Sequence, residues 1–148
     1  MVSHAPRLGF DLVSVDEVRA ALAAHGDRYV SRIYSARERM QCMVDGRLSA
    51  QRLAARFAAK EATAKALGRG DEDALAWKTI EVLLTSAGSP SLHLEGLASR
   101  LHRRAGSPDL AVSLSEGSLT AAAVVVATPV RVRATGEKRD PSVDSPPV

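Results

Sequence analysis

The sequence predicts a single α+β domain, with one long helix near its middle and strands towards both ends. An alanine-rich segment from Ser49 to Leu67 favours helix, because alanine loses no side-chain entropy when the helix forms. Apolar residues alternate along residues 8–13 and again in the C-terminal third, which is typical of strands. The 148 residues are 45% hydrophobic and 25% charged, which suits one domain with a core. We expect this domain to span residues 1–127.

Composition excludes several classes of protein. The formal net charge of +3 is too small to indicate nucleic-acid binding, and aromatic residues, at 3%, are too few for base stacking. Cys42 is the single cysteine, so there is no disulfide framework. The longest apolar run, residues 121–127, is far shorter than the roughly 20 residues of a membrane helix, and the N-terminus lacks a signal-peptide core. We expect a cytoplasmic protein without nucleic-acid or membrane partners.

The first predicted strand, residues 8–13, has two different faces. One face carries Leu8, Phe10 and Leu12, and the other carries Gly9, Asp11 and Val13. Asp11 therefore lies away from the bulkier apolar residues and is a candidate functional residue.

Capping signals predict the helices of the first half. Ser14 and Glu17 have the spacing of a capping box, which predicts a helix from about residue 15 until Gly26 ends it. Ser35 and Glu38 repeat the spacing and predict a short helix towards residue 43. A turn at residues 45–46 then precedes the long helix, which Gly68 can end in the left-handed conformation.

The second half reads mainly as strands. A charged surface loop is expected at residues 69–73, followed by a hairpin whose strands contain residues 80–84 and 92–94, with a turn at 88–90. A helix at about 97–105 precedes two strands, 109–115 and 119–127. Residues 128–148 hold prolines among charges and few large apolar residues, which predicts a disordered tail.

The long helix gathers charged residues at helical spacing. Glu61 and Lys65 are four residues apart and share a face, as do Arg56 and Lys60, while an apolar stripe containing Phe57 runs beside them. The plain explanation for Glu61 is an ordinary ion pair with Lys65, which would contribute about 0.3–0.5 kcal/mol. The plain explanation for the cations is a solvated basic face. A carboxylate among cations also suggests a site.

Three motifs together resemble the holo-acyl-carrier-protein synthases, the small class of 4′-phosphopantetheinyl transferases. They are Gly9-Phe10-Asp11-Leu12-Val13, then Arg56-Phe57-Ala58-Ala59-Lys60-Glu61-Ala62 with Lys65 and Gly68-Arg69-Gly70, and finally Val112-Ser113-Leu114-Ser115. The middle motif is highly specific, and the other two are specific only in its company. The resemblance implies the transferase fold, as a single unit with a mainly antiparallel sheet and a long central helix.

The resemblance also implies an activity. Members of this family transfer the phosphopantetheine arm of coenzyme A to a serine of an apo acyl carrier protein, using Mg²⁺ and releasing adenosine 3′,5′-bisphosphate. Mg²⁺ prefers oxygen ligands and commonly takes one or two carboxylates, with phosphate and water completing its coordination. By resemblance Asp11 and Glu61 bind this metal, and we expect Glu61 to deprotonate the carrier serine. Lys65 is then expected at the phosphates of the substrate.

Other positions follow from the same resemblance. Contacts with coenzyme A are implied for Arg56, Lys60, Gly68 and Ser113, and docking of the acidic carrier protein for Arg28. Two positions depart from the family pattern. Glu116 stands where a histidine usually contacts the nucleotide, and Glu17 stands where relatives often carry a basic residue, although Glu17 also completes a capping box.

The two departures leave the partner and the activity open. The carrier could be that of fatty-acid synthesis or one of polyketide or peptide synthesis. Larger members of the superfamily resemble two such units fused, so a single short unit is expected to complete its site across subunits, as a homotrimer. The alternatives are a coenzyme A or nucleotide-binding module of the same fold that has lost transfer activity, and a basic interaction protein without a small ligand.

Overall fold

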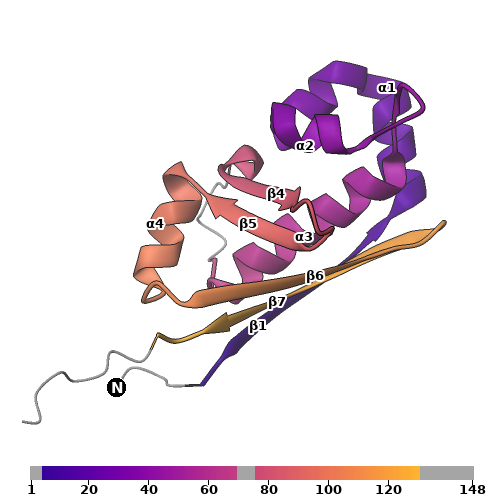
Figure 1. Ribbon diagram of the computed structural model, residues 1–148. Helices are drawn as coiled ribbons and strands as arrows, with labels where there is room; N and C mark the ends of the chain where they lie inside the picture. The colour runs from indigo at the N-terminus through magenta and orange to yellow at the C-terminus, as the bar shows by residue number, and fades with distance from the viewer. Residues whose placement is uncertain (1–4, 70–75, 131–148) are drawn as a thin grey trace, which may run out of the picture.

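The computed structural model describes residues 5–69 and 76–130 and has the expected α+β composition (Figure 1). In chain order its elements are β1 (Arg7–Ser14), α1 (Val15–Ile33), α2 (Ala36–Gln41), β2 (Met43–Val44), β3 (Arg47–Leu48), α3 (Ala50–Ala66), the 3-10 helix η1 (Trp77–Thr79), β4 (Ile80–Leu84), β5 (Pro90–Leu94), α4 (Gly96–Arg104), β6 (Asp109–Glu116) and β7 (Thr120–Thr128). All strand pairs are antiparallel. Within these described ranges, no helix combines the length and apolar character needed to cross a membrane.

The long helix α3 forms the middle layer of the molecule. It packs on one side against a three-stranded sheet of order β1-β7-β6 and on the other against the β4–β5 hairpin (Figure 1). Alanines fill most of its buried surface, which keeps the layers close together. The approach is closest at Gly9 of β1, where an added Cβ would lie 2.8 Å from both the carbonyl carbon of Ala62 and the nitrogen of Ala66. The glycine therefore lets β1 lie directly against the helix backbone.

The two faces of β1 alternate as predicted, and the face carrying the smaller residues is the buried one. Gly9 and Val13 lie against α3, together with the buried Val125 of β7. Leu8, Phe10 and Leu12 point to the outer face of the sheet, where they are 65%, 49% and 59% exposed. β1 therefore presents an apolar strip on the outer face of the sheet to solvent in the single chain.

The first helix differs from its prediction at its C-terminal end. Gly26 breaks the helical backbone with φ 49° and ψ −128°, as the sequence predicts, but the chain then resumes helix as far as Ile33. The sequence predicts no helix for this second segment. At the other end, the Ser14 side chain caps the helix by accepting a hydrogen bond from the Glu17 backbone N–H at 3.3 Å.

The remaining local predictions are confirmed for the described residues. The capping box between Ser35 and Glu38 is complete, residues 45 and 46 turn with positive φ, and Gly68 follows α3 with φ 72°. The hairpin, α4 and the last two strands form within a few residues of their predicted positions. Cys42 is buried, and burial raises the pKa of its thiol to about 11. The expected tail beyond residue 130 and most of the expected charged loop lie outside the described residues.

Candidate functional site

The site forms where β1 lies against the C-terminal half of α3. Asp11 follows Gly9 on the buried face of β1, so the close approach at Gly9 brings its carboxylate to the helix. Lys65 reaches back from α3, with its Nζ 2.6 Å from Asp11 Oδ1, and donates a second hydrogen bond to the Phe10 carbonyl oxygen at 3.1 Å. The sequence suggested Glu61 as the partner of Lys65, whereas the structure pairs Lys65 directly with Asp11.

Glu61 lies one helical turn before Lys65 and is half-buried. Burial raises the pKa of its carboxyl above the ordinary value, and the negative charge of Asp11 raises it further, while Arg69 and Lys65 lower it in part. Lys65, which holds the Asp11 carboxylate at 2.6 Å, shares a helix face with Glu61, so the two carboxyl groups lie on the same side of α3. The structure therefore brings together two carboxylates that lie far apart in the sequence.

This pair of carboxylates fits a hard divalent cation. Two negative groups held close together repel each other unless a positive charge is shared between them, and oxygen is the ligand that Mg²⁺ prefers. In the described ranges, no group of three or more histidine, cysteine, aspartate or glutamate residues is placed to hold a metal. A cation at Asp11 and Glu61 would thus take its other ligands from substrate phosphate and water, which is usual for Mg²⁺.

Lys60 and Arg56 do not join this cluster in the single chain. Both side chains are completely buried on the side of α3 that faces α2 and the hairpin. The Lys60 ammonium lies 2.9 Å from the Glu38 carboxylate and donates to the carbonyl oxygens of Trp77 and Ile80. Burial lowers the pKa of Lys60, which the charge of Glu38 offsets in part.

Arg56 is held nearby by uncharged groups. Its guanidinium donates to Gln41 Oε1 at 3.1 Å and to the Arg52 carbonyl oxygen at 3.3 Å, and its buried Nε has no hydrogen-bond partner among the described residues. This position is one helical turn from Lys60, and the predicted shared face of the two residues is therefore present.

The other expected coenzyme contacts lie in separate places. Gly68 is exposed just beyond α3, where its N–H donates to the Lys65 carbonyl oxygen at 3.0 Å, so it adjoins the cluster. Ser113 is exposed on the outer face of the sheet, in register with Val124, which in turn pairs with Phe10. Within one chain, Ser113 therefore faces away from Asp11.

Glu116 also lies apart from the carboxylate pair. It lines a cavity of about 540 Å³ beside the N-terminal turn of α3, whereas Lys65 lies near the other end of that helix. Arg19, Arg47 and Arg52 line the same cavity. The carboxylate of Glu116 is thus placed among arginines.

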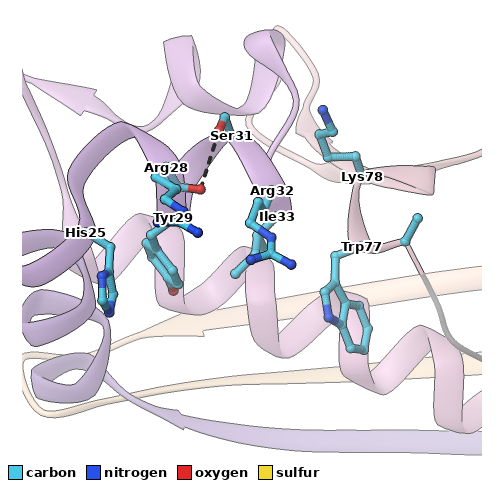
Figure 2. A pocket seen from close by; sticks show the side chains of 9 residues that line it. His25, Arg28, Tyr29, Ser31, Arg32, Ile33, Trp77 and Lys78 are labelled. Atoms are coloured by element: carbon cyan, nitrogen blue, oxygen red, sulfur yellow. Dashed lines mark hydrogen bonds between the residues drawn. The ribbon is translucent and has the colours of Figure 1, made fainter.

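A basic cleft lies between the second segment of α1 and η1 (Figure 2). Its volume is about 890 Å³, and it is lined by His25, Arg28, Tyr29, Ser31, Arg32, Ile33, Ala76, Trp77 and Lys78. Arg28, the residue expected to dock a carrier protein, stands on one wall, and Trp77 and Lys78 stand on the other. Among the described residues, the lining contains cations and aromatic rings but no carboxylate, so this part of the cleft suits an acidic partner.

Two residues that the sequence analysis did not single out connect the cleft with the carboxylate pair. The Arg69 guanidinium lies 5.2 Å from the centre of the Trp77 ring and also lowers the pKa of Glu61. The Trp77 ring packs edge to face on Phe57 of α3, with centroids 5.4 Å apart. Arg69 belongs to a motif quoted above, but no local sequence pattern identifies Trp77, because its place depends on how η1 packs on α3.

Comparisons with known proteins show what the chain is similar to. The family model described as the 4′-phosphopantetheinyl transferase superfamily matches residues 7–123. The holo-[acyl-carrier-protein] synthase of Solidesulfovibrio magneticus is 43% identical over 119 residues, covering 80% of this chain and 94% of that protein. The protein of the same name from Chloroflexus aggregans is 41% identical over 129 residues, covering 80% and 92%. An ACPS–CoA complex from Chronobacterium ammoniagenes has a TM-score of 0.73 and 30% identity, covering 86% of this chain and 99% of that one.

Proposed function

Because the chain belongs to the 4′-phosphopantetheinyl transferase superfamily, we propose that its site performs the transfer that its relatives are named for. The reaction moves the 4′-phosphopantetheine arm of coenzyme A to a serine of an apo acyl carrier protein and releases adenosine 3′,5′-bisphosphate. The observation that carries this proposal is the meeting of Asp11, Glu61 and Lys65 at the α3–β1 contact. A module that only binds coenzyme A would not require a carboxylate pair of this kind.

The chemistry assigns a task to each of these residues. The serine oxygen forms a bond to the phosphorus of the phosphopantetheine group, and the bond from this phosphorus to the bridging oxygen of the pyrophosphate breaks. Asp11 and Glu61 would hold Mg²⁺, which supplies positive charge to the phosphate oxygens when it is bound. Lys65 adds a fixed cation beside Asp11, where negative charge develops on the phosphates.

The serine proton is assigned to Glu61. Burial and Asp11 raise the pKa of Glu61 in the metal-free protein, whereas a bound Mg²⁺ would lower this pKa and keep the carboxylate ionised, as a base requires. The proton leaves the serine oxygen as the new bond to phosphorus forms, and the carboxylate accepts it directly or through an intervening water. The bisphosphate departs with the electrons of the broken bond.

Coenzyme A is proposed to bind along the C-terminal end of α3. Lys65 and Gly68 adjoin the carboxylate pair there, and the exposed backbone of Gly68 allows close approach of a phosphate. Contacts of Arg56 and Lys60 with coenzyme A remain predictions from the resemblance, since both side chains are buried in the single chain.

We also propose that the active form is a homotrimer with sites between subunits. The support is the exposed apolar outer face of the sheet, which contains Leu8, Phe10 and Leu12, because apolar patches of this kind usually mark an interface. Ser113 lies on the same outer face, so a contact of Ser113 with coenzyme A would have to serve the site of another subunit.

The carrier protein is proposed to dock at the basic cleft, with Arg28 on its α1 wall. An acidic surface of the carrier would be attracted by Arg28, Arg32 and Lys78, and the aromatic rings would cover its apolar side chains. The carrier belongs to fatty-acid or polyketide synthesis. A cytoplasmic location is proposed from the single, unpaired Cys42.

One assay tests the proposal against its alternatives. The protein is incubated with coenzyme A, Mg²⁺ and several apo carrier proteins, and the carriers are weighed by mass spectrometry. We expect the mass of one phosphopantetheine group to be added with the wild-type chain and with Glu95→Gln, an exposed control, but not with Glu61→Gln. Coenzyme A binding without any modified carrier would favour the binding module, and absence of both would favour a basic interaction protein.

A further inference from the structure

The free edge of strand β4 is closed by side chains. β4 pairs with β5 on one side only, and on the other side it meets residues of α2 and α3. Glu38 accepts from the Val82 N–H at 2.9 Å, and Gln41 both accepts from the Leu84 N–H at 2.8 Å and donates to the Leu84 carbonyl oxygen at 2.9 Å. Lys60 completes the row by donating to the Ile80 carbonyl oxygen.

Lys60 is the member of this row that also reaches η1. Its ammonium donates to the Trp77 carbonyl oxygen at 3.1 Å as well as to that of Ile80, and it thereby holds the residues at both ends of η1. Because the ammonium is completely buried, each contact replaces a lost contact with water. The backbone of the η1 segment that carries Trp77 and Lys78 is thus tied to α3 through the Lys60 nitrogen, in addition to the packing of the Trp77 ring on Phe57.

The opposite wall of the basic cleft is tied to the same nitrogen. Tyr34, which directly follows α1, places its ring centre 5.8 Å from Lys60 Nζ and donates from its hydroxyl to the Leu53 carbonyl oxygen at 3.0 Å. Glu38 lies 2.9 Å from Lys60 and also accepts from the Ser35 N–H at 2.8 Å, immediately after Tyr34. Lys60 therefore contacts groups that fix the position of both walls.

We propose that Lys60 is a positioning residue for carrier binding, which sets the separation of Trp77 from the α1 wall of the basic cleft and does not contact coenzyme A. The identity of the docking partner, an acyl carrier protein, rests on the proposed function. The role differs from the contact with coenzyme A that the resemblance implies for Lys60. Lys60 and Glu61 are neighbours in sequence. Lys60 lies on the side of α3 that faces the basic cleft, whereas Glu61 lies on the side that faces β1.

The experiment compares kinetics for the two substrates. Lys60→Met alone would leave Glu38 buried without its cation, so the main variant combines Lys60→Met with Glu38→Gln, which keeps an acceptor for the Val82 N–H. Thr63→Val is the matched control, because Thr63 is also buried and polar on α3 but its hydroxyl donates within its own helix, to the Ala59 carbonyl oxygen at 2.7 Å. Steady-state rates are measured with coenzyme A and an apo acyl carrier protein that the wild-type chain modifies.

We expect the double variant to raise KM for the carrier roughly tenfold, while KM for coenzyme A and the dependence on Mg²⁺ stay within about twofold of the wild-type values. Thr63→Val should lower the melting temperature without changing either KM. A raised KM for coenzyme A with an unchanged KM for the carrier would overturn the proposal, because Lys60 would then act on the coenzyme. A lower melting temperature with both KM values unchanged would also overturn it.

Trp77 provides a readout that does not depend on activity, because it is the single tryptophan of the chain. In the double variant we expect its fluorescence emission to move to longer wavelength and to be quenched more readily by acrylamide, since η1 is no longer held in place. Unchanged emission and quenching would overturn the proposal. If the wild-type chain modified no carrier, the proposed function would fail, and the fluorescence would still decide whether Lys60 positions Trp77.

Discussion

Glu61 has a carboxyl group whose surroundings favour its protonated form. Burial and the charge of Asp11 both raise its pKa, so it should titrate above the ordinary value for glutamate in the metal-free protein. Asp11→Asn removes one of the two causes and should lower the pKa of Glu61. Carboxyl NMR of the metal-free protein measures both values. A pKa of Glu61 that is the same with and without Asp11 would contradict the proximity of the two groups.

The same pKa governs how Mg²⁺ competes with protons for the site. Binding of the metal requires the ionised carboxylate, so the apparent affinity for Mg²⁺ should fall as the pH falls through the pKa of Glu61 in the metal-free protein, at a higher pH than for an ordinary glutamate. The contribution of Glu61 to the free energy of unfolding has the opposite dependence on pH, because a carboxyl with a raised pKa in the folded state stabilises the fold only at low pH. This contribution is lost as the pH rises through the raised pKa.

Lys65 is expected to matter through its charge. Replacing it with methionine removes the cation beside Asp11, and kcat/KM for coenzyme A should fall about 10²–10³-fold, as for other fixed donors at developing negative charge. Lys65→Arg should recover part of the loss. Steady-state kinetics provide the measurement, with Lys78→Met as a comparison that should change KM for the carrier instead. Equal rates for wild type and Lys65→Met would exclude the assigned role.

At the scale of residues, the sequence predicts which side chains lie together better than it predicts their ion pairs. The motif names Asp11, Glu61 and Lys65, and the structure places them at one contact. The ion pair of Lys65 could not be assigned from helical spacing, because β1 brings a competing carboxylate from outside the helix. The burial of Lys60 could not be predicted from the sequence either, because it depends on how α2 and the hairpin pack on α3.

At the scale of elements, the contact between β1 and α3 depends on Gly9, which has no side chain. Gly9→Ala should lower the free energy of unfolding by about 3 kcal/mol or more, because the new Cβ would overlap the backbone of Ala62 and force the layers apart. Urea denaturation measures the change. Gly88→Ala is the control: its Cβ would meet open space, and its positive φ should cost only about 1–2 kcal/mol. Equal losses for the two variants would show that the close approach is unimportant.

Elements with local signals were predicted well, and those without them were not. The capping box at Ser35 and the glycine after α3 act within a few residues, so their sequence is sufficient. The helical segment after Gly26 carries no capping signal that the sequence analysis used, and it forms where Val30 and Tyr34 are buried against the core. The alternation of residues along β1 predicts that the strand has two different faces, but the packing of α3 decides which face is buried.

At the scale of the whole molecule, the exposed outer face of the sheet should be an interface in solution. Phe10→Glu places a charge in this face and should convert a trimer into monomers with little transfer activity. Light scattering with size-exclusion chromatography gives the mass. Met40→Glu is the matched control, because Met40 is 75% exposed but lies on α2, on the far side of α3 from the sheet (Figure 1). A wild-type chain that is monomeric would remove the basis for shared sites.

The buried Cys42 thiol can report how often the core of the protein opens. Its raised pKa of about 11 leaves almost no thiolate at neutral pH, and the core shields the sulfur from reagents. Alkylation should therefore proceed only from molecules in which the core has opened, so that the labelling rate measures how often this happens. Adenosine 3′,5′-bisphosphate, which has no thiol to consume the reagent, should slow labelling in proportion to its occupancy of the native state, and its affinity could then be determined without a carrier protein or any turnover.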